Sequence, residues 1–402
     1  MKVCMLVYAF YETDTRVMQY ATALAERGES VDVIALRKDG TAAFEVIEGV
    51  NVYRIQDRKI NEQSRFDYLF RIIRFLLASA FFLTKKHLSS PYRVIHVHSV
   101  PDFLVFAALV PKLRGARVIL DIHDILPEFY ASKFNIGSKS LMFKIMVVVE
   151  KLSVAFADHV IIANDLWRER LVARSVRADK CTTFINYPDS RIFYPRPKPA
   201  HDGKFVIIYP GTLNAHQGLD IALRAFARIA SGMPNAEFHI YGDGPTKPSL
   251  RHLAHDLGLS ERVIFHPFLS VREVAPIMAT SDLAVVPKRA SSSFGNEAAS
   301  TKIMEFMSEG VPVVVSRTRV DTFYHDDSRV RFFESENESD LAESILLLYR
   351  NPQLRRELVS NAFEYVRQNN WQERKIDYFR LVDNRAPDEA IAQNGAWHGV
   401  TG

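Results

Sequence analysis

The chain has 402 residues and a formal net charge of +4 at pH 7, and hydrophobic residues make up 48% of it. This length is more than one core usually serves, so two globular domains are expected. The small charge and the lack of a Lys/Arg block exclude a nucleic-acid-binding stripe, and we expect no nucleic-acid partner.

Two cysteines, Cys4 and Cys181, are too few for a disulfide framework. Cys4 lies in an apolar run, where a buried thiol is the ordinary expectation. The short apolar stretch after Met1 runs into polar residues, so it is not typical of a secretory signal. These features together predict a reducing, cytoplasmic setting.

The N-terminal half alternates short apolar runs with helix-like segments. An amphipathic helix is predicted over 16–27, closed by Gly28, between the first two runs. The runs rich in branched residues are 3–8, 31–36, 94–98, 117–121 and 159–163. Such alternation is typical of a parallel sheet with helices on both faces.

The apolar segment 66–83, followed by Lys85, Lys86 and His87, allows two interpretations. Its charge-free part is too short to cross a bilayer. It is either a buried helix of the first domain or a helix whose aromatic edge and basic neighbours rest on an anionic membrane surface. The second interpretation places 66–87 in peripheral contact with the inner face of the cell membrane.

A Pro-rich stretch over 194–203 is the best linker candidate, and a second alternating series follows it. Its predicted strands are 205–209, 237–241, 263–265, 283–286 and 311–315, and its helices include 219–230 and 302–308. The predicted division is an N-terminal domain over 1–195, a C-terminal domain over 196–365, a terminal helix over 366–385 and a mobile tail over 386–402. The predicted fold class is α/β, with two doubly wound, Rossmann-like domains.

The most informative stretch is 291–316. It reads as a small-residue loop, a cap at Ser300 and Thr301, a short helix, a Gly stop and a buried strand. The N-terminus of a helix suits a diphosphate, and Lys302 would add a full charge in the first turn. Glu305, one turn on, could accept hydrogen bonds from two ribose hydroxyls, and Glu297 precedes the helix.

Two absences narrow the chemistry. No glycine occurs before Gly28, so the first strand lacks the Gly-x-Gly-x-x-Gly of a dinucleotide-dependent dehydrogenase. No Asp-x-Asp motif and no His/Cys metal spacing occurs, which favours a reaction without metal or cofactor, in which dipoles and cations stabilise a departing diphosphate.

Glu297 and Glu305 have the Glu-x7-Glu spacing of family 4 retaining glycosyltransferases (glycosyl transferases group 1), and 300–315 resembles the polysaccharide-assembly members of that family. Outside this context, two solvated helix carboxylates would be the ordinary interpretation of the pair. The resemblance implies the GT-B fold, in which two Rossmann-like domains face each other across a cleft. It also implies that Glu305 holds the ribose and that Glu297, as a catalytic residue, contacts the donor sugar.

The stretch 209–213 with Gly218 resembles the family's first loop of the second domain, where Gly211 would let the backbone approach the phosphates. Many relatives carry Arg or Lys in this loop. Here Thr212 and Gln217 occupy the matching positions, with His216 adjacent, so Lys302 and the helix N-terminus are left to compensate.

Three first-domain residues are singled out with alternatives. The family places a histidine at the position of His123 against the donor sugar, which makes it a candidate catalytic residue; a packed or helix-capping histidine is the alternative. Asp14 and Arg16 lie in a loop that often faces the acceptor in the family, although helix capping explains Asp14 equally well.

The resemblance implies transfer of a hexosyl or N-acetylhexosaminyl group, most plausibly from a UDP-sugar, with retention at the anomeric carbon. The expected acceptor is a bacterial surface polysaccharide or a lipid-linked oligosaccharide. Two rival functions stay open: a non-catalytic binding partner with the same fold, motivated by Thr212 and Gln217, and a nucleotide-sugar epimerase or hydrolase.

Overall fold

The computed structural model describes residues 1–58, 65–134, 137, 139–198, 203–291 and 293–384. The chain divides into two compact units. Unit 1 comprises Met1–Asn186 and the segment from Lys375 onward, and unit 2 comprises Tyr187–Arg374. Unit 1 therefore ends upstream of the predicted linker, and the return at Lys375 lies inside the predicted terminal helix. The predicted tail 386–402 lies outside the described residues.

Unit 1 is built on an eight-stranded sheet in the order β3-β4-β2-β1-β5-β6-β7-β8. The strands are β1 (Lys2–Val7), β2 (Ser30–Arg37), β3 (Phe44–Ile47), β4 (Val50–Asp57), β5 (Val94–Ser99), β6 (Arg117–Ile122), β7 (His159–Ile162) and β8 (Cys181–Thr183). The central strands are parallel and almost wholly buried, as their unbroken apolar runs predict. Cys4 and Cys181 are free and buried, which confirms the expectation for Cys4.

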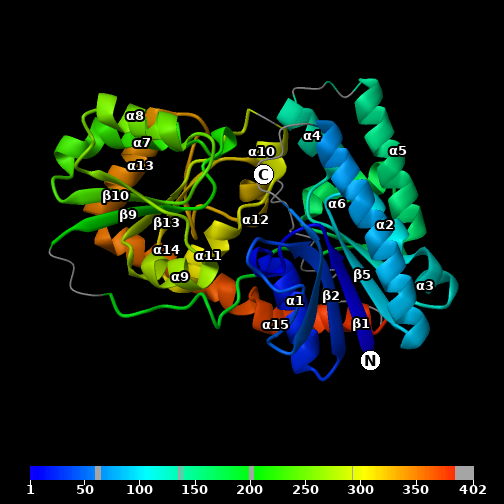
Figure 1. Ribbon diagram of the computed structural model, residues 1–402. Helices are drawn as coiled ribbons and strands as arrows, with labels where there is room; N and C mark the ends of the chain where they lie inside the picture. The colour runs from blue at the N-terminus through cyan, green and yellow to red at the C-terminus, as the bar shows by residue number, and fades with distance from the viewer. Residues whose placement is uncertain (59–64, 135–136, 138, 199–202, 292, 385–402) are drawn as a thin grey trace. The chain divides into compact units, whose positions relative to one another are not determined.

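Helices cover both faces of this sheet (Figure 1). α1 (Thr15–Glu26) lies on one face, where Tyr20 stacks on Tyr378 of α15 (Trp371–Val382). The opposite face carries α2 (Arg65–Ser89), the 3-10 helix η2 (Asp102–Ala108), α3 (Leu109–Leu113), α4 (Leu126–Phe134), α5 (Leu141–Phe156) and α6 (Asp165–Arg174). Right-handed crossovers toward β8 put these elements in one layer.

The predicted parallel sheet gains an antiparallel pair at one edge, where β3 runs antiparallel to β4. Glu48 and Gly49 form the connecting turn, and both have positive φ, 49° and 80°. A turn of this kind matches the twist of a hairpin. An Asn-Gly or Asp-Gly pair would have predicted the hairpin, but Glu-Gly is a weaker turn signal.

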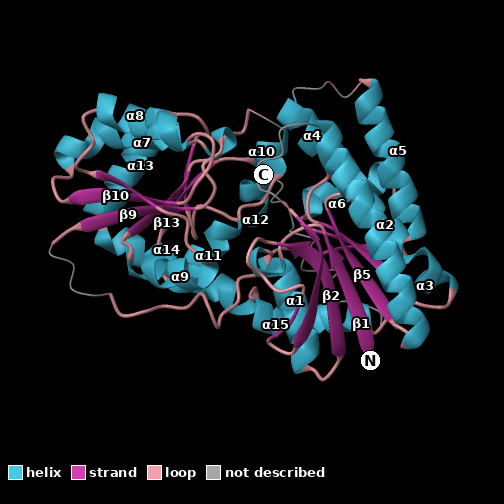
Figure 2. Cartoon of the chain, viewed as in Figure 1, coloured by secondary structure: helices cyan, strands magenta, loops and turns pink. Residues whose placement is uncertain are grey.

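Unit 2 holds a six-stranded, all-parallel sheet in the order β11-β10-β9-β12-β13-β14 (Figure 2). The strands are β9 (Phe205–Pro210), β10 (Ala236–Tyr241), β11 (Val263–His266), β12 (Leu283–Val286), β13 (Val313–Ser316) and β14 (Arg331–Phe333). The order reverses between β9 and β12, and ligands bind at such switch points in open α/β sheets.

Helices also cover both faces of the unit 2 sheet. One layer holds α7 (Leu219–Ile229), α8 (Lys247–Asp256) and α13 (Glu338–Arg350), and the other holds α9 (Val271–Thr280), α11 (Thr301–Glu309) and α14 (Pro352–Gln368). Two short helices, α10 (Ser293–Glu297) and α12 (Arg319–Tyr324), complete the unit. Both units are thus doubly wound, as predicted. Among the described helices of the chain, none is long and apolar enough to cross a membrane.

Candidate functional site

The N-terminus of α11 lies at the carboxyl edge of the unit 2 sheet. Ser300 is its N-cap residue, with extended φ and ψ of −91° and 117°, and its side chain makes no capping hydrogen bond. The Ser300 hydroxyl is buried and has no hydrogen-bond partner among the described residues. The first N–H groups of a helix have no partner within the helix, and those of α11 lie beside this hydroxyl. The arrangement suits an anion with several acceptor oxygens.

Lys302, in the first turn of α11, reaches across to the loop after β9. A Cβ built on Gly211 would lie 2.7 Å from Lys302 Cε and 3.2 Å from Nζ, so a side chain here would displace the end of Lys302. Gly211 also has φ 138°, which side chains rarely adopt. Burial lowers the pKa of Lys302, and the charge of Lys288 adds to this, whereas Glu305 opposes it. The structure therefore brings together two predicted donor-binding residues, Gly211 and Lys302, and Lys302 supplies the positive charge.

Thr212 and Gln217 meet around the hydroxyl of Tyr209. This hydroxyl lies 3.1 Å from both the Thr212 carbonyl oxygen and Gln217 Oε1. Gln217 Nε2 lies 3.1 Å from His216 Nε2. Polar contacts within the loop therefore occupy Gln217. Two full positive charges lie near this loop: the Lys302 ammonium, 5.3 Å from the Tyr209 ring centroid, and the Arg289 guanidinium, whose Nε donates to the Ala215 carbonyl at 3.1 Å.

Glu305 and Glu297 have different environments. Glu305 is half-buried one turn beyond Lys302, and burial raises its pKa while the charge of Lys302 partly opposes the rise. Glu297 is 5% exposed at the end of α10, and its Oε1 lies 3.1 Å from Nη1 of Arg319. The alternative of two solvated carboxylates therefore does not describe this pair.

Lys288 is a residue that sequence reasoning missed. It follows β12, is 3% exposed, and its ammonium lies 2.9 Å from Asp321 and donates to the Ala298 carbonyl at 2.7 Å. It thereby fixes the backbone just before the N-terminus of α11. Its place after a buried parallel strand was the available signal, because ligand-site residues gather at that edge.

Unit 1 holds a second cluster, centred on Asp121 at the end of β6. Arg16 Nε and Nη2 donate to its two carboxylate oxygens at 2.8 and 2.9 Å, and Arg16 Nη1 donates to Asn186 at 2.9 Å. The Arg16 side chain is only 7% exposed. Arg16, which was predicted to face the acceptor, thus donates its hydrogen bonds to Asp121 and Asn186, which both belong to unit 1.

His123 lies beside Asp121, with 3.3 Å between Nε2 and the nearer carboxylate oxygen. Burial alone would lower the pKa of His123, but the charge and hydrogen bonding of Asp121 outweigh it and raise the pKa. Its side chain is 21% exposed, so part of the ring faces solvent. His123 is thus a partly exposed imidazole at a sheet edge, and its raised pKa favours the protonated form.

His96 and His98, both on β5, extend this cluster inward. Nδ1 of His98 lies 3.2 Å from both Asp121 and His123, and Nδ1 of His96 lies 3.0 Å from the Tyr378 hydroxyl. Ligand atoms of His96, His98 and Asp121 all fall within 4.8 Å of one another, close enough to hold a metal ion. Sequence spacing gave no hint of this group because it draws on two strands. The Arg16 guanidinium on Asp121 would repel a cation there.

Asp14 caps α1 by accepting a hydrogen bond from the Val17 backbone at 3.1 Å. This confirms the capping interpretation, and acceptor binding by Asp14 stays a prediction.

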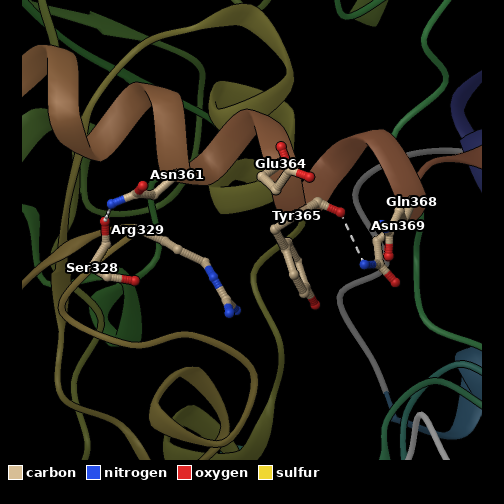
Figure 3. A pocket seen from close by; sticks show the side chains of 7 residues that line it. All are labelled: Ser328, Arg329, Asn361, Glu364, Tyr365, Gln368 and Asn369. Atoms are coloured by element: carbon tan, nitrogen blue, oxygen red, sulfur yellow. Dashed lines mark hydrogen bonds between the residues drawn. The ribbon is translucent and has the colours of Figure 1, made fainter.

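A pocket of about 460 Å³ lies elsewhere in unit 2, between α14 and the loop before β14 (Figure 3). Asn361 donates across it to the Ser328 carbonyl at 2.9 Å. None of the predicted donor-binding residues lines it, so it is separate from the α11 site. Its lining residues are Ser328, Arg329, Asn361, Glu364, Tyr365, Gln368 and Asn369.

Comparison with known proteins adds two family matches. A model described as "Glycosyl transferases group 1" matches residues 190–365, and a "Glycosyl transferase 4-like domain" model matches residues 13–186. The first match contains every predicted donor-binding residue, and the second contains Asp14, Arg16 and His123.

Individual relatives are more distant. An uncharacterized glycosyltransferase of Methanocaldococcus jannaschii, MJ1607, is 26% identical over 325 residues, which is 74% of this chain and 74% of that protein. Sucrose-phosphate synthase from Thermosynechococcus elongatus superposes with a TM-score of 0.75 at 18% identity, covering 96% of this chain and 98% of that one. Anabaena Alr3699/HepE in complex with UDP-glucose gives 0.69 at 18% identity, covering 98% and 99%.

Proposed function

The chain belongs to the group 1 glycosyl transferases and has their two-domain GT-B fold, and from that membership we propose a reaction in which it transfers a sugar from a nucleoside diphosphate to an acceptor hydroxyl. The proposed donor is a UDP-sugar carrying a hexosyl or N-acetylhexosaminyl group. The proposed acceptor is a bacterial surface polysaccharide or a lipid-linked oligosaccharide.

One observation carries the donor site: the Lys302 ammonium lies beside Gly211 at the N-terminus of α11, which begins at the buried Ser300 hydroxyl, without a hydrogen-bond partner in the described part of the chain. A diphosphate would receive hydrogen bonds from the first-turn N–H groups and charge from Lys302. Lys302 thus replaces the cations that many relatives carry at Thr212 and Gln217. This compensation favours a working enzyme over a non-catalytic partner.

Glu305 is proposed to accept hydrogen bonds from the two ribose hydroxyls. The UDP-glucose bound by the Anabaena neighbour supports UDP as the nucleotide. Since Lys302 and the helix N-terminus already supply positive charge to the phosphates, the proposed reaction needs no metal and no cofactor.

The proposed stereochemistry is retention. The bond between the anomeric carbon and the diphosphate oxygen breaks, the acceptor oxygen bonds to the same face of that carbon, and the departing phosphate takes the acceptor proton. Glu297 and His123 are proposed to contact the donor sugar. Exclusion of water would limit donor hydrolysis.

The test of the donor site is a thermal-shift screen against UDP-, GDP-, ADP- and dTDP-sugars, with and without a chelator. A bound donor raises the melting temperature by mass action. We expect a shift with UDP-sugars that survives the chelator and is lost in Glu305→Ala, while Glu343→Ala, an exposed glutamate of α13, keeps it. Lys302→Met should weaken donor binding by roughly 10–100-fold, because a hydrogen bond to a charged group usually contributes about that factor in affinity.

A shift with no donor, or one unchanged in Glu305→Ala, would contradict the donor site. Product analysis by NMR tests the stereochemistry with an oligosaccharide acceptor, and inversion at the anomeric carbon would rule out retention. Donor consumption without an acceptor would indicate the epimerase or hydrolase instead.

A further inference from the structure

α2 exposes apolar side chains where a surface helix normally carries polar ones. One face packs on the unit through residues such as Ile72 and Phe75. The opposite face carries Phe70, Leu77 and Phe81, each 64–73% exposed. Their helical spacing puts them on one line along the outside of the helix. α2 therefore carries apolar side chains on the side that faces away from its unit as well as on the side that packs on it.

α5 repeats this pattern. Leu141, Ile145, Val148 and Leu152 recur at helical spacing and are 48–74% exposed, whereas Met146 on the other side is buried. α3 adds exposed leucines at its two ends, the second of which is 79% exposed. Single exposed apolar residues are ordinary, but three neighbouring elements with apolar outer stripes are not.

These elements belong to one layer. Both α2 and α5 pack on η2, and α2 also packs on α3. Figure 1 shows all of them on the side of the unit 1 sheet opposite α1. Their outer stripes therefore form one surface, which we call the outer face: the exposed sides of α2, α3 and α5.

The exposed charges on the outer face are mostly basic. Its exposed basic residues are Arg74 and Lys85 on α2, Arg114 after α3, and Lys144 and Lys151 on α5. The sequence of α2 contains one acid, which pairs with Arg71, and that of α5 contains one, which is buried against Arg174. Within the described parts of the three helices, the one partly exposed carboxylate is that of Asp67, which pairs with Arg71; just after α5, the exposed Asp158 pairs with Lys112 of α3. Basic side chains therefore outnumber exposed carboxylates on this face.

We propose that the outer face docks on an anionic lipid bilayer. Apolar side chains interleaved with lysine and arginine are what an interfacial helix needs to enter the headgroup region while its charges meet anionic lipid. A second copy of the chain would bring like charges against each other, which disfavours self-association through this face. Docking extends the contact predicted for 66–87 to three elements and does not depend on the transfer reaction.

The test is flotation of the full-length chain with vesicles that contain no glycan acceptor. We expect binding to phosphatidylcholine–phosphatidylglycerol vesicles, weaker binding to phosphatidylcholine alone, and loss of the difference at high salt. Leu77→Glu/Phe81→Glu should weaken binding by roughly tenfold or more, because burial of one such side chain is worth about that factor. Phe268→Glu, at a residue of unit 2 that is 63% exposed, is the matched control and should bind normally.

Val148→Glu/Leu152→Glu tests the part of the face beyond α2, and it should weaken binding by a similar factor. Unchanged binding in both double variants would overturn the proposal. So would a dimer in sedimentation velocity that Phe81→Glu dissociates while vesicles bind nothing. The double variants replace exposed residues, so each should keep the melting-temperature shift with donor. Loss of vesicle binding is thereby distinguished from misfolding and from failure of the donor site.

Discussion

Arg16 and Asp121 form a buried, bidentate ion pair. Such a pair is not itself strong evidence of stability, because removing both charges from water is costly. Loss of one partner, however, leaves the other charged and unpaired in the interior. The first turn of α1 is therefore tied to the end of β6 by an ion pair in which neither partner can be replaced alone without leaving a buried charge.

Arg16→Leu is expected to destabilise unit 1 by about 3–5 kcal/mol, because Asp121 stays buried without its main partner. Urea unfolding measures the change. Arg177→Leu removes half of an ion pair with Asp179 whose side chains are 82% and 66% exposed, and it should change the free energy of unfolding far less than Arg16→Leu. Equal effects of the two substitutions would contradict the structural role assigned to Arg16.

The raised pKa of His123 gives a pH dependence with a definite sign. The folded state holds the proton more tightly than the unfolded chain, so this group stabilises the fold below its unfolded pKa. That contribution is lost as pH rises through the folded pKa. We expect the free energy of unfolding to fall above about pH 6.5 in the native chain and to fall less in His123→Gln.

NMR titration of the imidazole protons checks the same point directly. His123 should stay charged to a higher pH than a free histidine. His159 is the internal contrast, because burial and nearby cations lower its pKa to about 4. If His123 titrated with a midpoint below that of a free histidine, Asp121 could not be stabilising the protonated imidazole as proposed.

Two glycines show how an element's backbone sets its tolerance to change. Gly218, at the start of α7, and Gly258 have nearly equal φ values of 67° and 70°. A Cβ on Gly218 would lie 1.9 Å from the Pro287 carbonyl oxygen, whereas a Cβ on Gly258 meets nothing within 4 Å. The two positions therefore separate backbone strain from steric overlap.

Gly258→Ala should cost about 1–2 kcal/mol from its left-handed backbone alone. Gly218→Ala should cost about 1–3 kcal/mol more, because the overlap with Pro287 forces the loop after β9 away from β12. Chemical denaturation of the two variants measures the difference, and weaker donor binding should accompany Gly218→Ala alone. Similar costs would show that the contact relaxes freely.

Ten strands (β1, β2, β5–β7 and β9–β13) and α11 were predictable because each depends on local pattern, whereas the three-residue edge strands β8 and β14 were not predicted. Buried parallel strands read as unbroken apolar runs, and α11 has a cap before it and a glycine after it. The hairpin of β3 and β4 was missed because Glu-Gly is a weak turn signal. The orientation of α2 was left open, since a helix with apolar residues on two sides gives no sign of which side is buried.

The residues of the candidate site also fall into a group that the sequence predicted and a group that it did not. Lys302, Glu305 and Ser300 lie within one short stretch, so their convergence followed from helical spacing. Lys288 and the cluster of His96, His98 and Asp121 join segments far apart in sequence, and only the pairing of strands brings them together. The capture of Arg16 by Asp121, 105 residues away, was unpredictable for the same reason.

At the scale of the whole molecule, the end of α15 is part of unit 1 although unit 2 separates it from the rest of that unit. Tyr378 is fully buried there, 4.1 Å from the ring centroid of Tyr20 and hydrogen-bonded to His96. Tyr378→Ala is expected to cost about 3–5 kcal/mol. Hydrogen exchange should show faster opening of β5 and unchanged protection of β13, whereas equal loss in both units would contradict independent cores.

The interruption of unit 1 also sets an order of events during synthesis. Residues 187–374 leave the ribosome as one continuous piece and can fold as soon as they emerge. At about 5–20 residues per second, that piece occupies roughly 10–40 s, and throughout this time the first 186 residues lack the aromatic side chain that closes their sheet on the α1 face. The half of the nascent chain made first is therefore completed last, and its exposed tyrosine and histidines are where a chaperone would be needed.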